Sequence, residues 1–152
     1  MTYEIDGKQY VSIAVGWGGI FGLLYRATDH ASPGTVYTFA LGGDAQFPDV
    51  ARYKLGPLIS GVKYDPKDVP AGFGLYVSNC LFCHGVPGVD KGGNIPNLGY
   101  ADADVITNLY KVVLGREFAD LGMPDFTGKL KAEDLEKIKA FIQGTADSIR
   151  SK

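Results

Sequence analysis

The strongest constraint on this chain is the stretch CLFCHG, Cys80 to Gly85, because it holds both cysteines of the 152-residue sequence. Two thiols three positions apart, followed directly by a histidine, form the Cys-x-x-Cys-His spacing of c-type haem attachment. Cys80 and Cys83 can each form a thioether bond with one vinyl group of a porphyrin. His84 is then carried beneath the iron, where an imidazole nitrogen makes a strong axial bond. The motif therefore predicts a covalently held haem.

Two other chemistries use cysteines at this spacing. A thioredoxin-like dithiol belongs in a βαβ context, and the sequence around Cys80 shows no such pattern. A structural zinc site needs four ligands, and beyond this motif the chain offers only His30, in the polar turn TDHASPG, which we expect at the surface. Haem attachment is the preferred interpretation, and a non-haem redox enzyme using Cys80 and Cys83 as a dithiol is the alternative.

A second axial ligand is expected from elsewhere in the chain. Met123, in LGMPDF, is the only methionine besides Met1. Its thioether is a soft ligand that favours ferrous iron, so His/Met ligation raises the reduction potential and suits electron transfer. Pro124 stiffens the loop that presents the sulfur. The alternative role for Met123 is that of a gap-filling core residue.

Composition and charge argue against other classes of function. The net charge is −2, without clusters of Lys and Arg, so we expect no nucleic-acid partner. The apolar runs are far shorter than the ~20 residues of a membrane span, and none is expected. The start MTYEIDGKQY lacks a secretion signal, yet haem of this kind is normally attached outside the cytoplasm. We therefore expect a fragment of a longer periplasmic protein.

The chain changes character near residue 60, which predicts two parts joined by a linker. Strands are predicted at 8–15 and 35–41, between turns rich in Gly and Pro. Two strands alone do not form a stable sheet. The predicted divisions are residues 1–45 for the strands, 46–66 for a linker stiffened by prolines, and 67–152 for a helical domain.

Three helices are predicted in the last part, at residues 69–79, 103–114 and 132–145. The loops between them are long and rich in Gly and Pro, so we expect them to surround something other than protein. The expected fold class is mainly α: a helical domain around a covalent haem, preceded by a short β segment. The second helix carries an apolar stripe of Val105, Ile106, Leu109, Val112 and Val113.

A third motif gives the helical part a family resemblance. Pro96, in IPNL, lies twelve residues after His84, and the order CxxCH, IPNL, GMPDF resembles the small class I cytochromes c with His/Met ligation. The resemblance implies that the Pro96 carbonyl accepts a hydrogen bond from the second nitrogen of His84, which fixes the imidazole orientation. It also implies that GFGLYVSN is the first cytochrome helix. The residues expected in its contact with the last helix are Gly72 or Gly74 and Phe73 or Tyr76, against Phe141 and Ile142.

The first part of the chain extends the resemblance to a larger enzyme. DGKQYVSIAVGWGG and TVYTFALGG resemble the last propeller-blade strands of quinohaemoprotein alcohol dehydrogenases, which oxidise alcohols with pyrroloquinoline quinone (PQQ). In that family these strands lead through a linker into a C-terminal cytochrome c domain. The resemblance implies that haem accepts electrons from PQQH2 in the propeller domain and passes them to a soluble redox carrier or a membrane quinone acceptor.

Most of the propeller has no counterpart in this sequence. The positions for PQQ, its calcium ion and the catalytic aspartate are absent, so we expect this chain to carry electrons without oxidising alcohol. The alternative is a free-standing monohaem carrier whose N-terminal extension serves in docking or dimerisation. Tyr100, Arg116 and Trp17 are candidates for contact with haem propionates or a partner cofactor, and packing explains each equally well.

Overall fold

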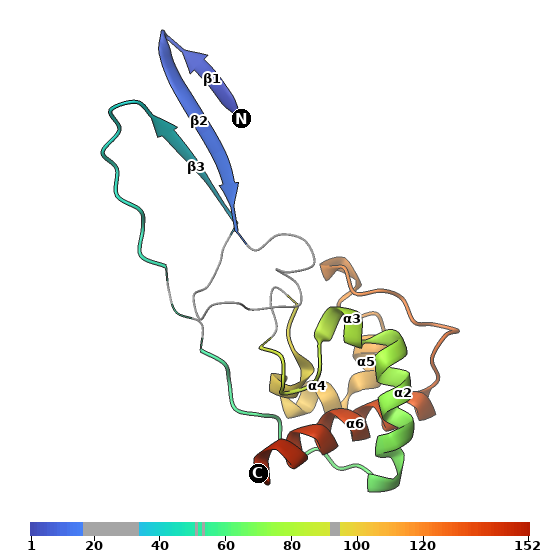
Figure 1. The fold of residues 1–152 in the computed structure, drawn as a ribbon. Helices are drawn as coiled ribbons and strands as arrows, with labels where there is room; N and C mark the ends of the chain where they lie inside the picture. Colours follow the sequence, from blue (N-terminus) through green and yellow to red (C-terminus); the bar gives the residue numbers. More distant parts are fainter. Residues whose placement is uncertain (17–33, 51, 53, 92–94) are drawn as a thin grey trace.

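A small antiparallel sheet precedes a helical domain in the computed structural model (Figure 1). The sheet has the order β1 (Thr2–Ile5), β2 (Lys8–Val15) and β3 (Thr35–Ala40). β2 and β3 confirm the two predicted strands, with β3 ending one residue before Leu41. The chain is therefore mixed helix and strand, and the expectation of a mainly α chain was too narrow. The structure describes residues 1–16, 34–50, 52, 54–91 and 95–152.

Strand β1 was missed by the sequence-based prediction. It pairs antiparallel with β2, with Thr2 opposite Val11 and Ile5 opposite Lys8. The turn between them has φ of 52° at Asp6 and 73° at Gly7, and a tight two-residue hairpin turn needs positive φ at both positions. Four residues are too few for an alternating pattern to be recognised.

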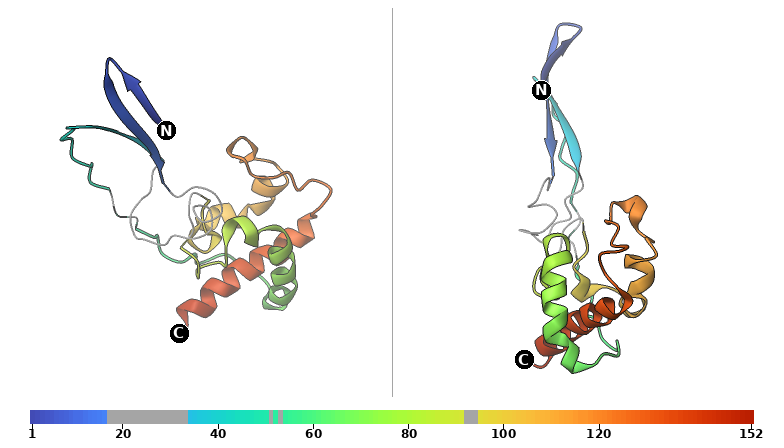
Figure 2. Two further views of the ribbon diagram at one scale, coloured as in Figure 1. Left: turned by 45° about the horizontal axis from the view of Figure 1, so that its top comes forward. Right: turned by 90° about the vertical axis from the view of Figure 1, so that its right-hand side faces the viewer.

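One face of the sheet is apolar and largely exposed. Val11 and Ile13 of β2 lie opposite Phe39 and Tyr37 of β3, and Phe47 packs edge-on against both aromatic rings. Val11, Ile13 and Phe39 nevertheless keep 37%, 48% and 44% of their surface exposed. Figure 2 shows the sheet projecting away from the helices in both views. Sheets normally bury such a face against a second layer.

The helical domain is organised by α2 (Val69–Asn79) and α6 (Ala132–Arg150), which pack against each other. A short 3-10 turn, η1 (Pro66–Asp68), leads into α2. Both helices were predicted, but α6 continues beyond the predicted end at Thr145. The additional turn buries Ala146 in the core.

Gly72 allows α2 and α6 to approach closely. A Cβ at this position would lie 1.9 Å from the backbone oxygen of Lys137, whereas a Cβ at Gly74 would meet nothing within 4 Å. Beside Gly72, Phe141 packs its ring against Tyr76 and Phe73, with centroids 5.1 and 5.5 Å apart. The packing implied by the cytochrome resemblance is therefore present, with Gly72 as the contact glycine.

The predicted helix at 103–114 is divided in two. α4 (Ala103–Thr107) and α5 (Leu109–Val113) are separated at Asn108, whose φ and ψ are −100° and 31°. The Asn108 side chain donates to the carbonyl of Asp104 at 2.9 Å, and such side-chain bonds compete with the regular backbone ladder. The apolar stripe predicted for this segment faces the interior on both short helices.

Part of the predicted linker packs on the helical domain. Ile59 and Val62 are 3% and 5% exposed and belong to the same core as α2 and α6. Residues 54–65 form neither helix nor strand, so no periodic pattern marked them as core. The divisions at residues 45 and 66 stay a prediction, and the packed unit begins upstream of residue 67.

The close crossing of α2 and α6 can be tested with a matched pair of glycine substitutions. We expect Gly72→Ala to lower the free energy of unfolding by about 1–3 kcal/mol, because its Cβ would overlap the Lys137 backbone. Gly74→Ala in the same helix meets open space and should raise stability by roughly 0.5–1 kcal/mol. Denaturant unfolding of the haem-loaded chain measures both. Equal stability of Gly72→Ala and wild type would contradict this crossing.

Candidate haem site

The Cys-x-x-Cys-His stretch forms a single helical turn directly after α2. Cys80 follows the last residue of α2, and α3 (Leu81–His84) comes next. The amides of Cys83 and His84 donate to the carbonyl of Cys80 at 3.2 and 2.9 Å. Gly85 then reverses the chain with φ of 65°, and a Cβ there would lie 2.7 Å from Oδ2 of Asp90. The glycine after the histidine is therefore required by both conformation and space.

His84 is held in one orientation by a backbone carbonyl. Its Nδ1 lies 2.8 Å from the carbonyl oxygen of Pro96, which is the hydrogen bond that the cytochrome resemblance implied. A carbonyl can only accept, so Nδ1 carries the proton and the lone pair is on Nε2. Burial lowers the pKa of His84, and the Pro96 contact opposes this shift. The histidine is thus a neutral imidazole with one nitrogen available to a metal.

Cys80 and Cys83 are half-buried at the end of α2 and form no disulfide with each other. Burial raises the pKa of Cys80 to about 12, with a smaller contribution from Cys83. Before haem attachment Cys80 is therefore a neutral thiol at physiological pH, unlike the low-pKa thiolate of a redox-active dithiol. Both sulfurs are available for covalent attachment.

Met123 lies in the loop between α5 and α6. This loop contains the short 3-10 turn η3 (Ala119–Leu121), and Gly122 turns the chain with φ of 91°. The amide of Met123 donates to the carbonyl of Phe118 at 3.2 Å. Its side chain is half-buried and packs against the core. Met123 therefore approaches the interior from a different segment than His84.

A cavity of about 340 Å³ brings the predicted residues together. Cys80, Cys83, His84, Pro96 and Met123 all line it. An adjoining hollow of about 320 Å³ also touches Cys83, His84, Pro96 and Met123. The remaining walls are mostly apolar and come from α4, α5, α6 and the loops. They include Leu98, Val105, Ile106, Leu109, Val112, Val113, Phe118, Phe126, Leu130, Leu135 and Ile138.

The residues present fit a porphyrin. The wall of this 340 Å³ cavity is mostly apolar, and a large apolar ligand removes such surface from water. A large apolar group with thioether attachment and a nitrogen ligand satisfies this lining. No cluster of three or more His, Cys, Asp or Glu is present among the described residues.

Asn97 was missed by sequence reasoning, although it stands in the quoted motif IPNL. It is 3% exposed and follows directly after Pro96. Its side chain bonds four backbone groups around the histidine loop, those of His84, Val86, Gly88 and Gly99. The signal that identifies it is a polar residue placed between two apolar ones beside a ligand motif.

Tyr100 and Arg116 are engaged with protein groups. The Tyr100 hydroxyl donates to the carbonyl of Gly88 at 3.1 Å, and its side chain also lines the cavity. Arg116 forms an exposed ion pair with Asp125 at 3.4 Å. His30 and Trp17 lie outside the described residues. Contact of Tyr100 or Arg116 with a haem propionate stays a prediction.

A family model described as "Cytochrome C oxidase, cbb3-type, subunit III" matches residues 67–142. That range contains CLFCHG, IPNL and LGMPDF. The chain belongs to this cytochrome c family. Its cofactor is a covalently bound haem c, and haem-mediated electron transfer is its chemistry. The cytochrome c interpretation is thereby confirmed over the dithiol and zinc alternatives.

The cytochrome domain has relatives that match the sheet as well as the helices. The chain is 63% identical over 152 residues to the "1-butanol dehydrogenase (cytochrome c)" of Thauera butanivorans. It is 61% identical over 151 residues to the quinohemoprotein alcohol dehydrogenase of Comamonas testosteroni. These alignments cover 100% and 99% of this chain, and 22% and 21% of the two relatives. The chain thus spans about a fifth of their length.

Solved structures extend this similarity to three dimensions. The crystal structure of the Comamonas testosteroni enzyme matches with a TM-score of 0.84 at 62% identity, over 98% of this chain and 22% of that one. The ADHIIG enzyme of Pseudomonas putida HK5 matches with a TM-score of 0.80 at 28% identity, over 99% and 22%. The predicted resemblance to the C-terminal cytochrome part of these enzymes is confirmed.

The size of the cavity predicts how the cytochrome domain behaves without haem. We expect the haem-free chain to lose fixed tertiary packing, because the apolar wall of the cavity would then have no partner to pack against. Near-UV circular dichroism and denaturant unfolding, with the haem-loaded chain as control, measure this. A cooperative transition of equal midpoint in the haem-free chain would contradict it.

Proposed function

We propose that this cytochrome domain accepts electrons from PQQH2 in the propeller domain of a quinohaemoprotein alcohol dehydrogenase and passes them to an external acceptor. The observation that carries this proposal is the extent of the similarity. Relatives that are 61% and 63% identical align over the sheet, the linker and the helices together. A similarity confined to the helical domain would support only a generic cytochrome.

Different residues of the cavity have different roles in binding the cofactor. Cys80 and Cys83 would bind its vinyl carbons, His84 would hold the iron through Nε2, and Met123 would supply a sulfur ligand from the loop between α5 and α6. Pro96 fixes the imidazole through the 2.8 Å contact with Nδ1, which increases the electron donation of the ligand nitrogen. Haem supplies the ferric–ferrous couple. The apolar walls exclude water and, with the Met123 thioether, favour the ferrous state.

The sheet supports the proposal that this chain lies beside a propeller domain. Its apolar face of Val11, Ile13 and Phe39 is exposed. This is expected of propeller-blade strands that pack against the rest of a propeller domain. The helical domain is proposed to be a class I cytochrome c fold, which the α2–α6 crossing and the His84–Pro96 contact support. In this arrangement PQQ and calcium are held by the propeller domain, outside this chain.

The acceptor and the compartment follow from the same proposal. A soluble redox carrier or a membrane quinone acceptor takes the electrons, and a periplasmic location suits covalent haem attachment. Among the described residues, no helix has the length and apolar character needed to cross a bilayer. A free-standing carrier is the less favoured alternative, because the relatives match the N-terminal sheet as well as the cytochrome part.

The proposal that this chain carries electrons but does not itself oxidise alcohol can be tested directly. We expect the purified chain to give a c-type pyridine haemochrome spectrum and to be reduced reversibly by a chemical reductant. We also expect no oxidation of 1-butanol with added PQQ and calcium, because these residues include no PQQ site. A complete enzyme of the same type serves as positive control for the assay. Alcohol turnover by the chain alone would overturn the proposal.

The assignment of Met123 has its own spectroscopic test. In Met123→Ala, the sulfur-to-ferric-iron charge-transfer band should disappear and the reduction potential should fall, because thioether ligation stabilises ferrous iron. Asp120→Ala is the control for the band, since Asp120 is in the same loop, is exposed and lines neither cavity. Persistence of the band in Met123→Ala would exclude Met123 as the ligand.

A further inference from the structure

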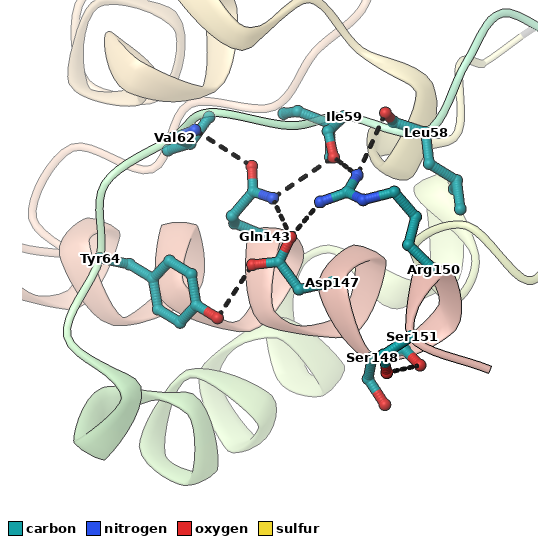
Figure 3. A network of polar contacts seen from close by, with 9 residues as sticks. All are labelled: Leu58, Ile59, Val62, Tyr64, Gln143, Asp147, Ser148, Arg150 and Ser151. Atoms are coloured by element: carbon teal, nitrogen blue, oxygen red, sulfur yellow. Dashed lines mark hydrogen bonds and ion pairs between the residues drawn. The ribbon is translucent and has the colours of Figure 1, made fainter.

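Residues 58–64, here called the strap, are fastened to α6 by one buried amide (Figure 3). Gln143 is 1% exposed. Its Oε1 accepts from the amide of Val62 at 3.3 Å, and its Nε2 donates to the carbonyl of Ile59 at 3.3 Å. Because the strap has no helix or strand of its own, these bonds satisfy buried backbone groups that would otherwise lack partners.

Charged and aromatic side chains complete the attachment around Gln143. Asp147 accepts from Gln143 Nε2 at 2.8 Å and from the Tyr64 hydroxyl at 3.1 Å. Arg150 donates to the carbonyl of Ile59 and pairs with Asp147. The carbonyl of Ile59 is therefore bonded by two side chains of α6, as Figure 3 shows.

The strap is also bonded toward the haem site. The amide of Ile59 donates to the carbonyl of Gly99 at 2.8 Å. The amide of Gly99 donates in turn to Oδ1 of Asn97 at 2.9 Å. Ile59 thus connects α6, through its carbonyl, with the turn after Pro96, through its amide.

Asn97 extends this series of hydrogen bonds to the backbone of His84. Its Oδ1 accepts from the amides of Gly88 and Gly99, both at 2.9 Å. Its Nδ2 donates to the carbonyls of His84 at 3.0 Å and Val86 at 2.8 Å. Two acceptor positions and two donor hydrogens are all that an asparagine amide offers. The side chain is fully used, with one bond on the peptide group of His84.

We propose that Asn97 and Gln143 are positioning residues for His84, so that the strap entering the cytochrome domain helps to set the orientation of the imidazole. The path runs from Gln143 through Ile59, Gly99 and Asn97 to the backbone of His84. It explains why a buried glutamine is placed in the apolar core, where leucine would fill the space without polar demands. The inference rests on the proposed haem role of His84.

The test uses the haem-loaded chain and a nearly isosteric change, Gln143→Met. We expect amide exchange at Val62 to become about tenfold faster or more, because one lost buried hydrogen bond costs on the order of 1–3 kcal/mol. We also expect the haem methyl resonances of the ferric protein to shift, since their pattern reports the orientation of the axial imidazole. Tyr64→Phe is the control, because it removes the outer bond to Asp147 and leaves Ile59 and Val62 bonded.

A second pair of variants tests the other end of the path. Asn97→Asp keeps the acceptors for Gly88 and Gly99 and loses both donors, so it should shift the same haem methyl resonances. Asn108→Asp makes the same chemical change where the side chain donates to Asp104 at 2.9 Å, and it should leave them unchanged. This pair tests the role of Asn97 independently of Gln143→Met.

The outcomes distinguish a failure of this inference from a failure of the proposed haem role of His84. Faster exchange at Val62 with unchanged haem methyl resonances would show that Gln143 only anchors the strap, and would overturn the inference. Unchanged resonances in Asn97→Asp would overturn it as well. A wild-type chain without a haemochrome spectrum would instead refute the proposed haem role of His84. Shifts in both variants, with both controls unchanged, support the path.

Discussion

The apolar cavity is the constraint on which the helical domain depends. α4 and α5 are short, and both turn their apolar residues toward the cavity, as do Leu135 and Ile138 of α6. These residues belong to one buried apolar core and at the same time line the cavity. Haem c therefore serves as the central part of the core as well as the redox group, and the loops can be long because they close over it. Stability and function share one cofactor.

Around this cavity, hydrogen bonds and close contacts with the backbone of loops fix the orientation of the side chains. His84 is oriented by the carbonyl of Pro96, and Gly85 is required by the approach of Asp90. Asn97 satisfies amides and carbonyls from both sides of the loop. Such loops have no regular ladder, so a buried amide side chain must take its place. The orientation of His84 consequently depends on residues outside the Cys-x-x-Cys-His motif.

The sequence predicts what depends on local spacing and misses what depends on tertiary partners. CxxCH, IPNL and GMPDF place the candidate site because each motif is short and contiguous, and α2 and α6 follow from periodicity. The strap has no period, so the burial of Ile59 and Val62 depends on Gln143, some eighty residues away. Asn108 ends a helix through one side-chain bond. Neither effect is visible in a hydrophobic pattern.

The strap also changes how the two parts of the chain are joined. With residues 58–64 bonded to α6 and to Gly99, the covalent connection to β3 comprises residues 41–57. A chain of that length reaches at most about 60 Å, at 3.3–3.6 Å per residue. The predicted linker, which ended at residue 66, would have left the first turn of α2 as the attachment point. Attachment beside Gly99 instead brings the incoming chain to the side of the domain that holds the histidine loop.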